Sequence, residues 1–189
     1  MKKCRPLWML GLTVLTLIGM NGCNRGTSVQ AAMNDQTPAV SEVERDFMTK
    51  ATQLNLAEIL MARLAVIKSS NNDVRDLARM VQSEHSGILE DLTDLMKAEN
   101  VSRLDTLPDQ TQQDIARMST LSGAEFDREF TNTLVTDHQR IIEMFRDQST
   151  TAQHPDVKAY AEATLPVLEL HLQNAQRIQS SLFSKGARS

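Results

Sequence analysis

The sequence predicts an all-α protein in which residues 41–184 form an antiparallel bundle of four long helices. Apolar side chains recur every three or four positions in four long segments, the spacing of one face of an α-helix. No segment shows the strict alternation of apolar and polar residues that marks a half-buried strand. About 145 residues in four long helices are enough to bury one core without disulfide bonds.

The first two helices are predicted at residues 41–69 and 72–99. Ser41 and Glu44 have the spacing of a capping box, which satisfies the first free N–H groups of a helix. Asn72 is a suitable cap for the second helix. The apolar faces consist of Phe47, Ala51, Leu54, Glu58, Met61 and Ala65, and of Val74, Leu77, Val81, His85, Ile88, Leu92 and Leu95.

A longer connection, residues 100–121, separates the second long helix from the third. Pro108 suits the first turn of a helix, and Ile115 and Met118 predict one short extra helix within this crossover. Ser122, Gly123, Ala124 and Glu125 form a second capping-box signature. The third long helix is therefore predicted at 123–149, with a face of Phe126, Phe130, Leu134, His138, Ile141 and Phe145.

The fourth long helix is predicted at residues 155–184 and starts at Pro155, because proline is favoured at the first helical position. Pro166 lies inside it and should kink the helix or widen one turn. Residues 185–189 are a short tail. The apolar face comprises Ala161, Thr164, Leu168, His171, Ala175, Ile178 and Leu182.

The N-terminal residues predict export. Lys2, Lys3 and Arg5 precede an uncharged run of 14 residues, Leu7 to Met20, the length of a signal-peptide core and too short to span a bilayer. The run ends at Gly22-Cys23, which resembles a bacterial lipobox. We therefore expect a signal peptide at 1–22, lipidation of Cys23, and membrane attachment through a flexible tether at 23–40.

The expected location is the periplasmic side of the cell envelope, on the outer membrane because Asn24 follows the cysteine. The alternative is a soluble periplasmic protein, produced by an ordinary signal peptide cut near Ala31-Ala32. The lipobox match is imperfect, because Met20 and Asn21 stand where Leu and a small residue are usual.

Charge and composition exclude several classes of function. The whole chain carries −4, and residues 1–22 carry three positive charges and no negative one, which leaves −7 on the remainder. An acidic domain with one Tyr and no Trp outside the leader lacks the basic stripe and stacking aromatic residues of a nucleic-acid binder. Cys4 falls within the leader, so a thiolate zinc site and a cysteine nucleophile are excluded from the mature chain.

Three of the four histidines stand near the midpoints of long predicted helices, on their apolar faces. They are His85, His138 and His171, and Glu58 takes the matching place on the remaining helix. Helices of similar length packed side by side bring their midpoints to one level. Burying four polar groups unpaired costs several kcal/mol. The sequence therefore predicts a central polar layer that is either hydrogen-bonded within itself or binds one divalent transition metal.

Three carboxylates are candidates to support these histidines. Glu84, Asp137 and Glu169 lie one or two residues before a histidine of the layer. A carboxylate that accepts the second imidazole N–H commonly orients a metal ligand, and the same contact also satisfies a buried histidine without metal. His154, beside Pro155 at a helix start, is expected on the surface.

Several motifs resemble one bacterial exported family, catalogued as domain of unknown function 4142. They are Ala78-Arg79-Met80-Val81 with Glu84-His85, Leu121-Ser122-Gly123-Ala124-Glu125-Phe126-Asp127, Leu134-Val135-Thr136-Asp137-His138, and Thr164-Leu165-Pro166-Val167-Leu168 before His171-Leu172. The resemblance covers residues 43–182 and implies a ferritin-like four-helix bundle behind a signal peptide. It implies no established activity. Asn55 and Glu84 stand where the family often has Gly and Asp.

Three hypotheses of function remain open. The first is a non-enzymatic envelope protein whose His/Glu layer is structural. The second is a mononuclear zinc, copper or iron site made by three imidazoles and a carboxylate. The third is an enzyme that uses a metal-bound water or a histidine base, although no nucleophile motif or phosphate loop is present. The sequence does not favour a di-iron oxidase of the ferritin type, because the chain has no Glu-x-x-His sequence.

Overall fold

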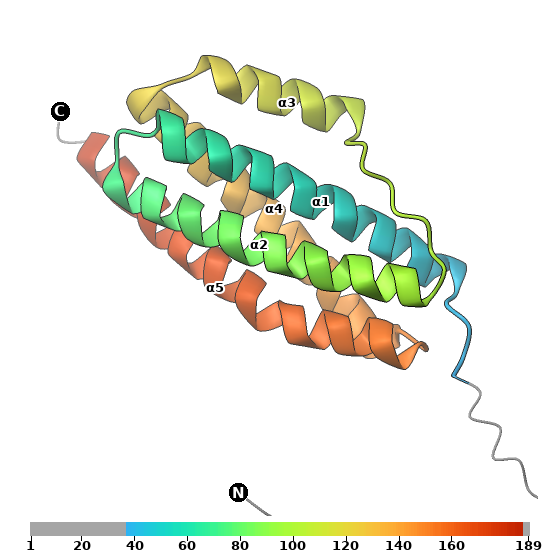
Figure 1. Ribbon diagram of the computed structural model, residues 1–189. Coiled ribbons are helices and arrows are strands. Elements are labelled where there is room, and N and C mark those ends of the chain that lie inside the picture. Colours follow the sequence, from blue (N-terminus) through green and yellow to red (C-terminus); the bar gives the residue numbers. More distant parts are fainter. Residues whose placement is uncertain (1–36, 187–189) are drawn as a thin grey trace, which may run out of the picture. The chain divides into compact units, whose positions relative to one another are not determined.

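The computed structural model describes residues 37–186, which contain five helices and no strand (Figure 1). Four long helices make a bundle, and a short fifth helix lies in the connection between the second and third long helices. The prediction of an all-α bundle with one extra helix in the crossover is confirmed. The helices are α1 (Glu42–Lys68), α2 (Asn72–Ala98), α3 (Asp109–Thr120), α4 (Gly123–Thr151) and α5 (Pro155–Gly186).

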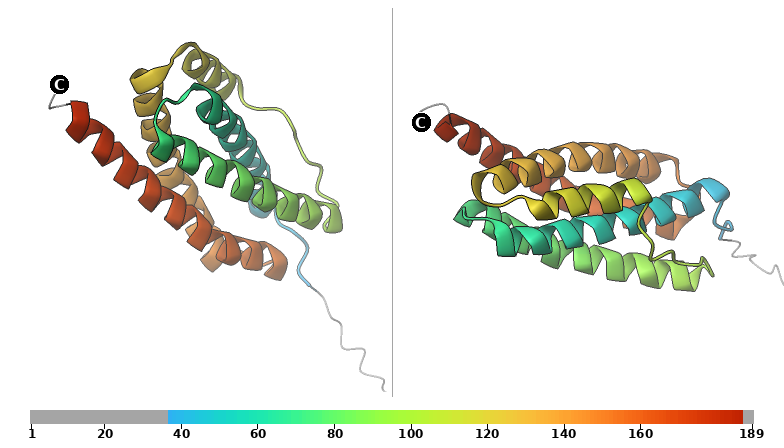
Figure 2. Two further views of the ribbon diagram at one scale, coloured as in Figure 1. Left: turned by 60° about the vertical axis from the view of Figure 1, so that its left-hand side comes forward. Right: turned by 90° about the horizontal axis from the view of Figure 1, so that it is seen from above.

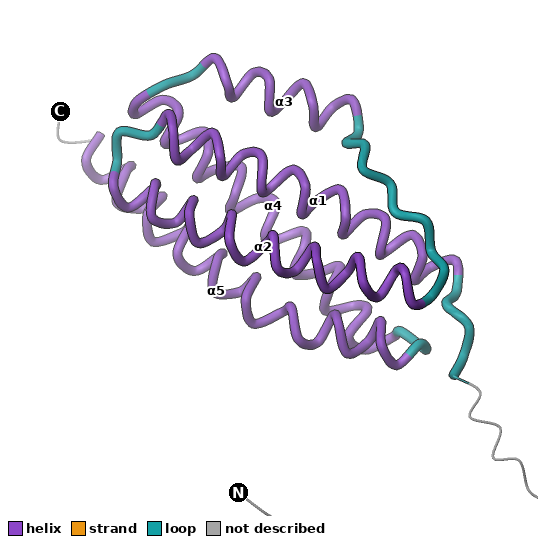
Figure 3. The backbone as a smooth tube through the Cα atoms, viewed as in Figure 1, coloured by secondary structure: helices purple, strands orange, loops and turns teal. Residues whose placement is uncertain are grey.

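The four long helices form two antiparallel hairpins, α1 with α2 and α4 with α5, each joined by a short loop (Figure 3). The crossover returns the chain along the bundle before α4 starts. The Lys68 ammonium group, at the end of α1, accordingly donates to the Leu121 carbonyl just before α4, at 3.4 Å. A bundle with one long crossover has the connectivity of ferritin-like folds.

Helix α3 lies outside the four-helix core, beside α1 and α4, as the two turned views show (Figure 2). Its Met118 side chain is buried and packs with apolar residues of the bundle, so the short helix is held by its inner face. Pro108 takes the position just before this helix. One consequence is that α3 covers the seam between α1 and α4, whereas the seam between α2 and α5 has no such cover among the described residues.

The ends of the helices partly follow the predicted capping residues. The capping box of Ser41 and Glu44 is present in both directions. Asn71, and not Asn72, caps α2 by accepting a hydrogen bond from the Asp73 N–H at 2.9 Å. The predicted capping box at Ser122 is wrong, because its side chain makes no cap hydrogen bond. Gly123 enters α4 with φ +55°, a left-handed conformation that changes where the next N–H groups point relative to Ser122.

Pro155 begins α5 as predicted, and α5 continues through Pro166 without a break in the helix. The helix ends at Gly186 rather than at 184. The predicted leader, Cys23 and nearly all of the tether at 23–40 lie outside the described residues. No helix in the described part of the chain combines the length and the apolarity needed to cross a bilayer.

Glu44 accepts hydrogen bonds from two segments that lie far apart in the sequence. Its Oε2 accepts from the Ser41 N–H at 2.7 Å, and its Oε1 accepts from the N–H groups of Gln153 and His154, each at 2.8 Å. Burial raises the pKa of Glu44, but the backbone hydrogen bonds from His154, Ser41 and Gln153 and the Ser41 hydroxyl outweigh burial and lower the pKa to about 2. One carboxylate therefore caps α1 and also anchors the loop that leads into α5.

Glu44→Ala should lower the free energy of unfolding by about 2–3 kcal/mol at neutral pH, because buried N–H groups lose a charged acceptor. Since the folded-state pKa of Glu44 lies below its ordinary value, the stabilisation is present above about pH 4.5 and fades as the pH falls toward 2. Urea unfolding at pH 7 and pH 3 measures both effects. Glu42→Ala, an exposed carboxylate in the same helical turn, should change stability by only a few tenths of a kcal/mol. An equal loss in the two variants would contradict the role of Glu44.

The core consists of two apolar clusters, one toward each end of the bundle. One cluster includes Phe47, Leu92 and Phe145, and the other includes Val81, Phe130 and Ile178. The predicted apolar faces are confirmed, with small exceptions such as half-buried Leu95 in place of buried Met96. Between the clusters lies a layer of buried polar side chains.

Candidate metal centre

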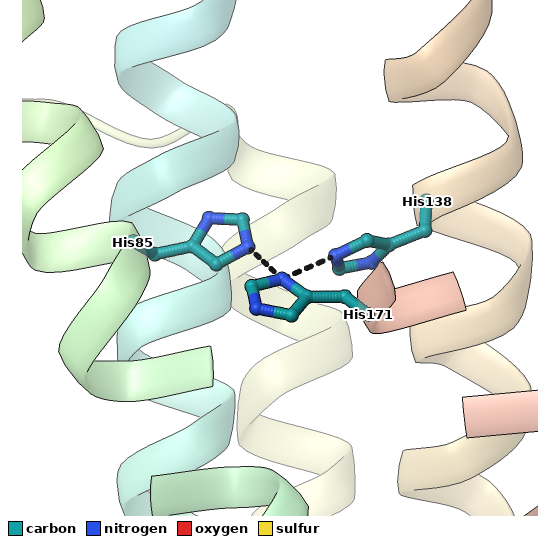
Figure 4. Close-up of side chains that lie close together, drawn as sticks. All are labelled: His85, His138 and His171. Carbon is teal, nitrogen blue, oxygen red and sulfur yellow. Dashed lines mark hydrogen bonds between the residues drawn. The ribbon is translucent and has the colours of Figure 1, made fainter. Parts of the chain in front are cut away.

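The buried polar layer is centred on three histidines from three different helices. His85 comes from α2, His138 from α4 and His171 from α5, and each side chain is at most 1% exposed. Figure 4 shows the three rings turned toward one point. The Nδ1 atom of His171 lies 3.2 Å from Nε2 of His85 and 3.3 Å from Nε2 of His138. The structure thus brings together the three histidines that the sequence places at one level.

The outer nitrogen of each ring contacts a hydrogen-bond acceptor. His85 Nδ1 lies 2.9 Å from Asn55 Oδ1, and the Asn55 amide nitrogen donates to the Ala51 carbonyl at 2.8 Å, which fixes the orientation of that amide. His138 Nδ1 lies 3.0 Å from the Leu134 carbonyl, one turn earlier in the same helix.

The third ring follows the same pattern. His171 Nε2 lies 2.7 Å from Glu84 Oε2. A carboxylate, a carbonyl and an amide oxygen all accept hydrogen bonds, so each outer nitrogen must carry the ring proton. The inner nitrogens of the three neutral rings consequently carry lone pairs, and these three lone pairs converge.

The spacing of the inner nitrogens suits a single metal ion. Zn–N bonds of about 2.0–2.1 Å at tetrahedral angles place neighbouring ligand nitrogens about 3.4 Å apart. The two contacts made by His171 Nδ1, at 3.2 and 3.3 Å, are close to that spacing. The three ligand atoms all lie within 4.8 Å of one another.

Burial keeps the three rings neutral. It lowers the pKa of His85 well below its ordinary value and lowers the pKa of His138 to about 3, with the neighbouring histidines adding to both shifts. The pKa of His171 is also lowered by burial, although Glu84 acts in the opposite direction. At neutral pH all three imidazoles are therefore in the form that ligates metal.

Glu58 of α1 belongs to the layer but does not reach the point where the nitrogens meet. Its Oε1 lies 3.7 Å from Nδ1 of His138, the outer nitrogen of that ring. Glu58 is 1% exposed, and neither carboxyl oxygen has a hydrogen-bond partner within the described residues. Burial, followed by the charge of Asp137, raises the pKa of Glu58 well above its ordinary value. The predicted fourth ligand thus stands behind one of the three histidines.

The three predicted supporting carboxylates have different surroundings. Glu84, on α2, contacts His171 of the neighbouring helix α5 and not His85, the next residue in the sequence. Glu169 is exposed and pairs with Arg146 at 2.9 Å, away from His171. Asp137 lines a cleft of about 480 Å³ beneath α3 and makes no hydrogen bond to a histidine. Adjacent helical residues point about 100° apart, so closeness in sequence does not place a carboxylate at its neighbour's ring.

Sequence reasoning missed Asn55 as a functional candidate. Its side chain is buried on α1 and orients His85 from inside the bundle. The available signal was a polar residue three positions before Glu58, on the edge of an apolar face. Such a residue needs a partner when buried.

The family described as domain of unknown function (DUF4142) matches residues 29–178, most of the chain. This chain belongs to the DUF4142 family. The resemblance seen in the sequence motifs is thereby confirmed, and the family description carries no activity.

A solved structure is similar in fold to the DUF4142 bundle. The crystal structure of a DUF305 fragment from Deinococcus radiodurans matches with a TM-score of 0.68 at 15% sequence identity. The match covers 76% of this chain and 99% of that fragment. No curated protein matches the sequence significantly. At this identity the similarity establishes a shared helical fold and nothing about function.

The fourth histidine of this DUF4142 chain is buried, so the prediction of a surface position for His154 is wrong. His154 is 1% exposed, and its Nε2 lies 3.2 Å from Glu99 Oε2. The cause is Glu44, which binds the backbone of this loop and draws it against the bundle.

His154, Glu99 and Asp156 form a second group with metal-ligand atoms close together. It differs from the central site in one respect. His154 Nδ1 is buried and has no hydrogen-bond partner among the described residues. A metal on Nε2 would leave an N–H there without an acceptor, whereas every outer nitrogen of the central site has one. The central histidines are the stronger metal candidate.

Proposed function

We propose that this DUF4142 bundle binds one transition-metal ion through His85 Nε2, His138 Nε2 and His171 Nδ1. Three protein ligands are the number found in zinc sites that keep a further position for water or another ligand. Three imidazoles suit zinc, copper or iron. The described residues add no fourth ligand atom to this group.

The observation that carries this proposal is the convergence of three lone pairs inside an apolar core. A layer that served only to satisfy its own members would pair each acceptor with a donor. Here the donors all point outward to Asn55, the Leu134 carbonyl and Glu84, and the acceptors face one another. A cation between them removes the mutual repulsion and binds all three.

Two further features support a cation at this point. The Glu84 carboxylate hydrogen-bonds His171, which makes that imidazole a better ligand. The Glu58 carboxyl lies behind His138 with no hydrogen-bond partner in the described part of the chain, and its ionised form would offset the charge of a bound cation.

The competing function is a structural layer in which a proton takes the place of the metal. A proton on His171 Nδ1 would donate to His85 or His138 while Glu84 balances the charge. The lowered pKa of His171 disfavours that state at neutral pH. The two functions therefore differ in a measurable property, which is metal content at pH 7.

Metal analysis and cobalt(II) titration of the untagged protein test the proposal. We expect one bound ion per chain and a visible cobalt absorption typical of nitrogen ligation. Because burial lowers the pKa of the three histidines, binding should persist below pH 6, where exposed imidazoles become protonated and release metal. Protein that contains no metal and gives no cobalt spectrum would establish the structural layer instead.

A further inference from the structure

We propose that Glu84 is the residue through which a metal ion passes between solvent and the three buried histidines. This inference rests on the metal-binding function proposed above and adds a route to it. Glu84 would capture the hydrated cation at the surface of the bundle and transfer it to His171, whose ring then carries it to the other two imidazoles.

The surroundings of the site leave few alternatives for such a route. Along the bundle axis, the layer is closed on each side by an apolar cluster. The small cavity next to His85, lined by side chains such as Ile88, Phe145 and Leu168, has no room for a water molecule. A hydrated cation cannot cross these walls without losing its water ligands to apolar surface. The route must therefore run sideways, between helices.

Of the three hydrogen-bonded outer nitrogens, only that of His171 is connected to solvent. Asn55, the partner of His85, is 4% exposed, and Leu134, which supplies the carbonyl to His138, is fully buried. The side chain of Glu84 is 41% exposed while its Oε2 contacts His171. Among residues 37–186, Glu84 is thus the one hydrogen-bond partner of the three rings that lies partly at the surface.

The seam between α2 and α5 is hollowed on both sides of this contact. One groove of about 250 Å³ lies among Leu77 and Met80 of α2 and Asn174 and Arg177 of α5. A second, of about 510 Å³, lies among residues that include Ile88, Asp91, Thr164 and Val167. Glu84 and His171 stand between the two grooves in sequence on both helices. Figure 1 shows α2 and α5 side by side, with α3 on the other side of the bundle.

The charges along this seam favour a cation. The linings of the two grooves contain five aspartates and the guanidinium of Arg177. Asp76 and Asp94 are paired with Arg79 at 2.7 Å and Lys97 at 2.9 Å, which leaves the carboxylates of Asp73, Asp91 and Asp156 in excess over that guanidinium. A surface lined mostly by one sign of charge raises the local concentration of the opposite ion and speeds its association. Glu84 adds a carboxylate at the point where the seam meets a ligand.

The transfer needs only ligand exchange and a rotation. The cation exchanges water for the Glu84 carboxylate, which breaks the hydrogen bond to His171 Nε2. The freed imidazole would turn its unprotonated Nδ1 toward the cation and bind it. On return of the ring, Nε2–H would again donate to Glu84, and Nε2 of His85 and Nε2 of His138 would complete the binding of the ion. No proton is released, because all three rings start neutral.

The opposite seam offers the main alternative route. A cleft of about 480 Å³ lies beneath α3, with Asp137 in its lining. An ion moving inward from there meets Glu58 and then the outer nitrogen of His138, which is bonded to its own helix. Among the described residues, this path has no partly exposed side chain that is hydrogen-bonded to one of the three rings. Asp137 is therefore the matched comparison for Glu84.

Stopped-flow mixing of the untagged protein with cobalt(II) tests whether Glu84 binds the incoming ion or only orients His171. Glu84→Gln keeps an oxygen acceptor for His171 but removes the charge, and we expect its association rate constant to fall by about tenfold or more. The wild-type association rate should also decrease with ionic strength, and this dependence should weaken in Glu84→Gln.

Two further variants are the controls. Asp137→Asn should associate at the wild-type rate. Asn55→Ala removes a support that has no access to solvent, so it should raise the dissociation rate constant and leave association unchanged.

The outcomes distinguish the route from the function. If wild-type protein binds cobalt(II) while Glu84→Gln associates at the wild-type rate, Glu84 is only a support for His171 and the route is wrong. Slow association in Asp137→Asn with normal Glu84→Gln would place the route at the α1–α4 seam. Wild-type protein that binds no metal at equilibrium would remove the metal-binding function, and the route with it.

Discussion

Replacing His85 and His171 together with Gln should abolish a metal-dependent rise in melting temperature that the wild-type protein shows. A ligand at about one hundred times its dissociation constant stabilises the folded state by about 2.7 kcal/mol. For a bundle of this size that stabilisation corresponds to a rise of roughly 5–10 °C. Gln keeps a hydrogen-bonding group in the layer, so the variant should remain folded while two of the three ligands are lost. Differential scanning calorimetry with zinc, copper and iron salts measures the effect.

Glu58→Gln is the control for this experiment. The structure places Glu58 at the outer nitrogen of His138 and not among the inner nitrogens, so this variant should keep most of the metal-dependent rise. Loss of the rise in Glu58→Gln would instead make Glu58 a ligand. Wild-type protein that shows no rise with any of the three metals would favour the structural layer. In that case His→Ala at any of the three positions should still cost about 1–3 kcal/mol, because a buried partner is left unpaired.

Leu168→Asp should unfold the domain or leave it marginally stable. Leu168 is 1% exposed and belongs to the apolar cluster on one side of the polar layer. An uncompensated charge at such a position costs several kcal/mol, comparable with the whole stability of a domain, about 5–15 kcal/mol. Loss of helical circular dichroism, or a large fall in the urea midpoint, measures the effect.

Leu170→Asp is the matched control, two residues further along α5. Leu170 is 47% exposed, so the same substitution there should change stability by no more than about 0.5 kcal/mol. Similar destabilisation by the two variants would mean that α5 does not present its Leu168 face to the core. Comparable stability of Leu168→Asp and wild type would contradict the bundle itself.

The polar layer has a cost that a purely structural account leaves unexplained. Glu58 is buried, and its two carboxyl oxygens have no hydrogen-bond partner among the described residues. Three lone pairs also face one another on the far side of His138 from Glu58. A well-packed apolar layer of similar volume would avoid both penalties. In the metal-bound state proposed above, a cation would remove the repulsion between the lone pairs. Buried polar groups that break the rules of packing commonly mark functional sites.

The sequence alone determined the helices and the level of the histidines. Helical periodicity is a local property, so the apolar spacing around His85, His138 and His171 was enough to place these residues on buried faces. Similar helix lengths then put the three at one height. The capping box at Ser41 and the start of α5 at Pro155 could also be predicted from the sequence, because a cap depends on residues within one turn.

Only the tertiary structure decided which atoms meet. The spacing of residues along a helix does not fix the rotation of that helix against its neighbours, nor the rotamer of a histidine ring. These two variables determine which atom each ring nitrogen contacts. They bring Glu84 to His171 across the α2–α5 seam and Asn55 to His85, and they leave Glu58 behind His138. The burial of His154 likewise depends on Glu44, more than one hundred positions away in the chain, and no local pattern encodes that contact.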